Sequence, residues 1–73
     1  MAVVLYSKKG CAPCVGVKKF LDRKGVNYVE KDIELTANAM ELQWATGVLS
    51  APTVVDGDFV VVGPNYGRLA QLA

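Results

Sequence analysis

The pattern of apolar and polar positions predicts short strands separated by helices. Residues 2–6 form an apolar run of β-forming residues, which is typical of a central strand buried on both faces. Residues 27–33 alternate in polarity and predict a second strand, with Tyr28 and Glu30 on the face opposite Lys31. Because a helical segment separates the two strands, we expect them to be parallel and joined by a right-handed crossover.

Helical spacing dominates the segment between these strands. Val17, Phe20 and Leu21 recur at the spacing of one helix face. Gly25 ends this helix, because glycine tolerates the positive φ of a helix C-terminus.

A second helix is predicted after the second strand, with Thr36 as its cap and its end at about Ala45. Gly47 follows that end. Met40 and Trp44 are spaced i, i+4, so they share one face, and we expect both to pack in the core.

The last third of the chain predicts a hairpin and a short helix. Two β-rich runs, residues 53–55 and 59–62, flank an Asp-Gly turn. Residues 63–65 begin the final helix, whose Leu69 and Leu72 face inward. The element order is βαβαββα, which indicates an α/β fold.

Composition and charge narrow the function classes. With 73 residues, 52% of them hydrophobic, the chain predicts a single domain, residues 1–73, with a packed interior. Its 8 basic and 7 acidic residues nearly cancel, and its apolar runs are too short to span a bilayer, so we expect neither nucleic acid nor a membrane as partner. The first residues lack the pattern of a signal peptide, which favours the cytoplasm. The first helix carries a basic face that is either solvated or docks an acidic reductase: Lys18, Lys19, Arg23 and Lys24.

Cys11 and Cys14, the two cysteines of the chain, mark the candidate chemistry. They stand where the first strand gives way to the first helix, with Pro13 in the first helical turn, where its missing N–H costs nothing. Cysteines spaced i, i+3 at a helix start lie close enough to bond with little backbone movement. The helix N-terminus favours the thiolate of the first cysteine, which we expect to lie nearer solvent. The pattern predicts a dithiol redox site.

The cysteine pair has two alternative interpretations. A purely structural disulfide that closes so short a loop would stabilise the fold by only about 2 kcal/mol in the chain-entropy model. A metal site needs more ligands, since zinc takes four and the chain has no histidine. A dimer could still complete a zinc site or hold an iron–sulfur cluster, which leaves a dimeric metal-binding module as an alternative.

A set of short motifs covers essentially the whole chain and resembles the glutaredoxin family. They are Tyr6-Ser7-Lys8, Cys11-Ala12-Pro13-Cys14, Asp32-Ile33-Glu34, Thr46-Gly47, Ala51-Pro52-Thr53-Val54, Asp56-Gly57 and Gly63. The resemblance implies a thioredoxin-like fold in its minimal glutaredoxin form, a four-stranded mixed sheet flanked by helices. It also implies that Pro52 is cis and lies against the dithiol, where the backbone of Ala51 meets an extended substrate segment.

The resemblance further implies a thiol–disulfide oxidoreductase with no bound cofactor. Cys11 would attack a substrate disulfide and Cys14 would resolve the mixed disulfide. Lys8 either binds a substrate carboxylate or is a solvated loop lysine, and Asn65 either contacts substrate or caps the last helix. The implied substrate-binding residues are Lys8, Ala12, Pro13, Ala51, Pro52, Gly63 and Asn65.

The electron source is where this chain departs from the usual glutaredoxin pattern. The acidic pair that holds the amino group of glutathione in glutaredoxins is replaced by Pro64-Asn65-Tyr66. Ala51-Pro52 is similar to the NrdH-type redoxins, which reduce ribonucleotide reductase and are recharged by thioredoxin reductase with NADPH, and the missing acidic pair favours that electron source. We expect a monomer of that type, with a glutathione-dependent glutaredoxin as the alternative.

Overall fold

The computed structural model describes residues 3–72, so Ala2, the first residue of the predicted opening strand, lies outside the described residues. The element order βαβαββα is confirmed. The elements are β1 (Val3–Ser7), α1 (Ala12–Lys24), β2 (Tyr28–Asp32), α2 (Thr36–Thr46), β3 (Thr53–Asp56), β4 (Phe59–Val62) and α3 (Tyr66–Leu69).

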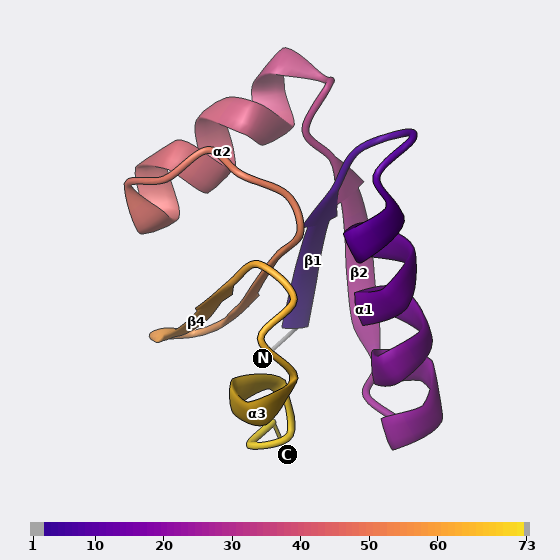
Figure 1. The fold of residues 1–73 in the computed structure, drawn as a ribbon. Coiled ribbons are helices and arrows are strands. Elements are labelled where there is room, and N and C mark those ends of the chain that lie inside the picture. The colour runs from indigo at the N-terminus through magenta and orange to yellow at the C-terminus, as the bar shows by residue number, and fades with distance from the viewer. Residues whose placement is uncertain (1–2, 73) are drawn as a thin grey trace.

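The four strands form one mixed sheet in the order β2-β1-β3-β4. β1 pairs in parallel with β2 and antiparallel with β3, and β3 pairs antiparallel with β4. Figure 1 shows α1 and α2 on opposite sides of β1 and β2. Two consecutive residues of β2 show the same division, because Glu30 pairs with Lys18 of α1 and Lys31 pairs with Glu41 of α2.

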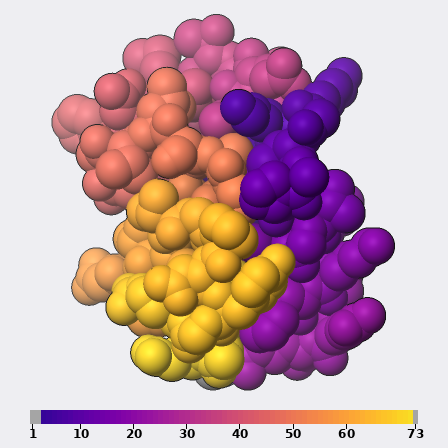
Figure 2. All heavy atoms as spheres, in the orientation of Figure 1, coloured from indigo at the N-terminus to yellow at the C-terminus, as the bar shows by residue number. Residues whose placement is uncertain are grey.

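The core lies between the sheet and the layer formed by α1 and α3. Leu5, in the central strand β1, is fully buried. Figure 2 shows α3, in yellow, lying directly against α1, in purple. Leu69 and Leu72 are buried, as the sequence predicted. The buried apolar cluster consists of Val3, Leu5, Val17, Leu21, Val26, Val54, Val61, Leu69 and Leu72.

The predicted burial of Met40 and Trp44 is wrong. Their side chains are 65% and 93% exposed, and they line a shallow hollow together with Gln43. The spacing does place both on one face of α2, but the helix meets the rest of the protein through Leu42, its one buried residue. Residues two positions before and after Leu42 lie about 200° around the helix from it and point away from the sheet.

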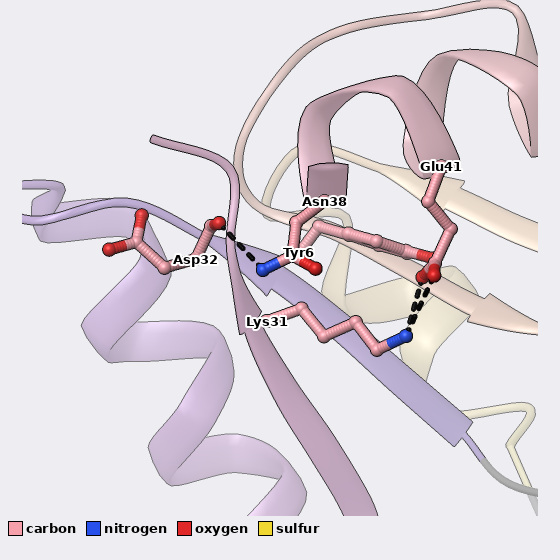
Figure 3. Close-up of polar contacts among 5 residues, drawn as sticks. All are labelled: Tyr6, Lys31, Asp32, Asn38 and Glu41. Atoms are coloured by element: carbon pink, nitrogen blue, oxygen red, sulfur yellow. Dashed lines mark hydrogen bonds and ion pairs between the residues drawn. The ribbon is translucent and has the colours of Figure 1, made fainter. Parts of the chain in front are cut away.

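The start of α2 also differs from the prediction. Thr36 is the first residue inside the helix, and the cap position belongs to Leu35, whose side chain makes no capping hydrogen bond. The side-chain amide of Asn38 instead donates to the carbonyl oxygen of Asp32 at 3.0 Å, as Figure 3 shows. This contact holds the first turn of α2 against the end of β2.

A polar cluster joins the buried strand β1 to α2. The Tyr6 hydroxyl donates to Glu41 at 2.6 Å, and the Lys31 ammonium donates to the same carboxylate at 2.7 and 2.9 Å (Figure 3). Burial, and then the hydrogen bond to Glu41, raise the pKa of Tyr6 from 10.0 to about 12. Lys31, and then Tyr6, hold the pKa of Glu41 below its ordinary value. These polar contacts link α2 to β1 and β2 in addition to its one buried side chain, Leu42.

Tyr6→Phe is expected to lower the free energy of unfolding by about 1 kcal/mol at pH 7, because it removes the hydroxyl that reaches Glu41. The contribution of the neutral phenol is fully present below pH 10 and is lost as the pH rises through about 12. The difference in free energy of unfolding between wild type and Tyr6→Phe should therefore be smaller at alkaline pH. Urea titrations at pH 7 and pH 11 measure this difference, and the same difference at both pH values would contradict the prediction.

Candidate active site

The position of Cys11 follows from how β1 ends. A short turn after Ser7 contains Gly10 with φ 71°, a conformation that glycine adopts without strain, and brings the chain to the start of α1. Cys11 is the N-cap residue of α1, and the backbone N–H of Cys14 donates to its Sγ at 3.2 Å. A free N–H and the positive end of the helix dipole at this sulfur favour its thiolate on reduction.

The two cysteines form a disulfide, with their Cα atoms 5.2 Å apart. The structure therefore describes the oxidised form of a C-x-x-C site. Cys11 is 8% exposed and Cys14 is 4% exposed, so both are buried, with Cys11 marginally more accessible. This small difference has the expected direction, but a partner must approach the rim of the site closely to reach either sulfur.

The segment before β3 lies against the disulfide. The Ala51–Pro52 peptide bond is cis, as the resemblance implied, and Pro52 is buried. The Sγ of Cys11 lies 3.9 Å from the carbonyl oxygen of Ala51. The backbone N–H of Gly63 donates to the carbonyl of Pro52 at 2.8 Å, which brings a third segment to the site.

The other predicted substrate-binding residues are Lys8, Ala12, Pro13 and Asn65. Lys8 and Ala12 line a cavity of about 380 Å³ beside the disulfide, and Pro13 is exposed in the first turn of α1. Asn65 is the N-cap of α3, and its side chain accepts a hydrogen bond from the backbone N–H of Arg68 at 3.2 Å. Of the two roles expected for Asn65, the geometry shows the capping role.

The sequence analysis missed a polar cluster at the cavity wall. Glu30 forms an ion pair with Lys18 at 2.8 Å and accepts a hydrogen bond from the Ser7 hydroxyl at 2.9 Å, and all three residues line the cavity with both cysteines. Lys18, and then Ser7, hold the pKa of Glu30 below its ordinary value, while Glu30 raises the pKa of Lys18. Lys18 follows Cys14 at helical spacing i, i+4, and this was the pattern that could have indicated the cluster.

The geometry of the site agrees with comparisons to known proteins. The sequence profile of the glutaredoxin family matches residues 3–60. The chain belongs to the glutaredoxin family. It is 32% identical over 71 residues to the glutaredoxin-like protein NrdH of Lactococcus lactis subsp. cremoris, covering 97% of this chain and 99% of that protein.

Two solved structures match this glutaredoxin-family fold closely. The thioredoxin-like protein BC3987 has a TM-score of 0.90 and 36% identity over 97% of this chain and 99% of its own. The glutaredoxin of Archaeoglobus fulgidus has a TM-score of 0.88 and 32% identity over 99% of this chain and 86% of its own. With a C-x-x-C disulfide at the start of α1, the protein is a thiol–disulfide oxidoreductase of the glutaredoxin and NrdH-like type.

Residues 3–72 lack two further features. Over this part of the chain, no group of three or more histidine, cysteine, aspartate or glutamate side chains is placed to hold a metal ion. Among the helices described, none combines the length and apolar character needed to cross a membrane.

Proposed function

We propose that Cys11 is the nucleophile and Cys14 the resolving thiol of a dithiol–disulfide cycle. In the reduced protein the Cys11 thiolate attacks a substrate disulfide, forms a mixed disulfide and releases one substrate thiolate, which takes up a proton. Cys14 then loses its proton to solvent and attacks the Sγ of Cys11. The Cys11–Cys14 bond forms, the second substrate thiolate leaves, and two electrons have passed to the substrate. An external reductant reopens the bond.

The N-cap arrangement of Cys11 supports this assignment of roles. The Cys14 N–H that donates to the Cys11 sulfur is a fixed donor at the place where negative charge develops when the disulfide is reduced. Lys8 would bind a substrate carboxylate at the rim, and the Ala51 backbone would pair with an extended substrate segment beside Ala12 and Pro13. The hydrogen bond from the Gly63 N–H to the Pro52 carbonyl would hold the Ala51 backbone in place for this pairing.

For the partners, we propose ribonucleotide reductase as the disulfide substrate and thioredoxin reductase with NADPH as the electron source. The observation that carries this choice is the segment after Gly63. It presents Pro64 and Asn65 where glutaredoxins have an acidic pair, and the side chain of Asn65 is occupied in capping α3. The segment offers no carboxylate to hold the amino group of glutathione. The similarity to a glutaredoxin-like protein NrdH over nearly the whole chain agrees with this choice. We also propose that the protein is a single-domain monomer, residues 1–73, that acts in the cytoplasm.

Parallel turnover assays test the electron source. One contains NADPH and thioredoxin reductase, the other glutathione with glutathione reductase and NADPH, and each follows NADPH oxidation with a protein disulfide as acceptor. We expect kcat/KM to be roughly tenfold or more higher with thioredoxin reductase, because one lost charged contact to glutathione costs about that factor. Recharging by glutathione alone would overturn the choice of donor and leave the dithiol cycle intact.

A further inference from the structure

A second hollow lies on the other side of α1 from the Lys18–Glu30 pair, between α1 and α3. It has a volume of about 370 Å³ and is lined by Gly16, Lys19, Phe20, Arg23 and Tyr66, and we call it the α1–α3 groove. The rings of Phe20 and Tyr66 lie 5.2 Å apart at an angle of 54° and form its apolar floor. Figure 2 shows the two elements meeting on an open face of the molecule.

Gly16 determines the shape of this groove. A β-carbon at position 16 would lie 2.5 Å from the Tyr66 hydroxyl oxygen, closer than atoms can pack. Glycine thus allows the tyrosine ring to lie against α1. Tyr66 nevertheless remains 41% exposed, so part of the residue is accessible to a partner.

The rim of the groove is basic. Lys19 and Arg23 are exposed, and within residues 3–72 the structure shows no ion pair for either of them. Lys18, on the same helix, is neutralised by Glu30, and Arg68 of α3 is engaged with the ring of Phe59 and the carbonyl of Val60. Lys19 and Arg23 therefore place two positive charges at the rim of the groove, whereas Lys24 lies outside it.

We propose that the α1–α3 groove docks an acidic segment of the protein whose disulfide is reduced, with an apolar side chain of that segment seated on Phe20 and Tyr66. This rests on the proposed dithiol cycle and adds to it a basis for choosing substrates. An apolar floor with cations at the rim complements acidic residues flanking an apolar one.

The geometry sets where the acidic residues must stand. Lys19 and Arg23 follow the attacking Cys11 on the first helix, about 12 and 18 Å farther along its axis at 1.5 Å per residue. An extended substrate chain advances about 3.3 Å per residue, so it covers that distance in roughly four to six residues. Substrates should carry acidic residues at that separation from the cysteine under attack.

Two disulfide-bridged peptides test the proposal with the full-length reduced protein. They share an apolar residue near the cystine and differ only in Asp and Glu, or Asn and Gln, about four to six residues from it. We expect kcat/KM to be about fivefold higher for the acidic peptide at low salt, and the preference to shrink at 0.5 M NaCl as exposed charges are screened. Equal turnover of both peptides overturns the docking proposal, whereas no turnover of either overturns the dithiol cycle.

Matched variants assign the preference to the groove. Arg23→Gln should lower the acidic-to-neutral ratio of kcat/KM about threefold. Lys24→Gln, which removes the same charge outside the groove, should leave the ratio unchanged. Gly16→Ala displaces Tyr66 without altering charge and should also lower the ratio, while Gly67→Ala, whose new β-carbon meets only an ordinary contact with Asn65, should not. Equal effects of Arg23→Gln and Lys24→Gln would contradict the assignment.

Discussion

Cys11→Ser is expected to abolish disulfide exchange, with a loss in kcat/KM on the order of 10³-fold or more, because a hydroxyl cannot replace the attacking thiolate. Cys14→Ser should block the reduction of protein disulfides yet keep the first attack, so that a mixed disulfide with the substrate accumulates. Mass spectrometry of each variant after incubation with a disulfide peptide measures both results. Trapping through Cys14 in the Cys11→Ser protein would show that the roles are reversed.

The large loss of activity expected for Cys11→Ser comes mainly from the absence of the sulfur, and the lowered pKa of the thiol contributes less. A thiol with a pKa of about 8.5 is roughly 3% thiolate at pH 7, and a fall of about 1.5 units makes it roughly half thiolate. The lower basicity reduces the nucleophilicity of each thiolate by about fivefold, so the attack rate rises only about threefold. The Cys14 N–H at the Cys11 sulfur therefore matters as much for making Cys11 a good leaving group.

Leu5→Ala is expected to lower the free energy of unfolding by about 3 kcal/mol, a large part of the stability of a chain this small. Leu5 is fully buried in β1, with β2 and β3 paired on either side, so no neighbouring backbone can move to fill the space. Leu35→Ala makes the same truncation at a side chain that is 61% exposed and should cost less than about 0.5 kcal/mol. Urea titrations of the reduced proteins measure both, and similar losses would contradict the position of the core.

The element order could be predicted from the sequence because each strand and helix is marked by the spacing of its apolar residues or by a glycine, proline or capping residue at its end. The sequence could not predict which face of α2 meets the sheet. Spacing places Met40 and Trp44 together, but only tertiary contact shows that Leu42, on the other side, is buried. The helix caps show the same limit: the capping role, one of the two roles predicted for Asn65, is confirmed, whereas the cap position predicted for Thr36 is taken by Leu35.

The candidate site was predictable where its residues are close in the chain. Cys11 and Cys14 belong to one helical turn, so their pairing follows from local geometry. The spacing of Lys18 from Cys14 places Lys18 on the cysteine side of α1, but its contact with Glu30 depends on the parallel pairing of β2 with β1, which that spacing does not encode. The departure after Gly63 was visible in the sequence, and the structure added that Asn65 is used as a cap.

The order of the sheet leaves β2 and β4 as its two edges. An open edge can recruit a strand from another copy and so begin aggregation. β2 carries the charges of Glu30 and Lys31, which oppose such pairing, whereas β4, with the sequence Phe-Val-Val-Val, carries none. The guanidinium of Arg68 already occupies the Val60 carbonyl on β4. Arg68 of the short helix α3 thus opposes strand addition at β4, which has no charged residue of its own to do so.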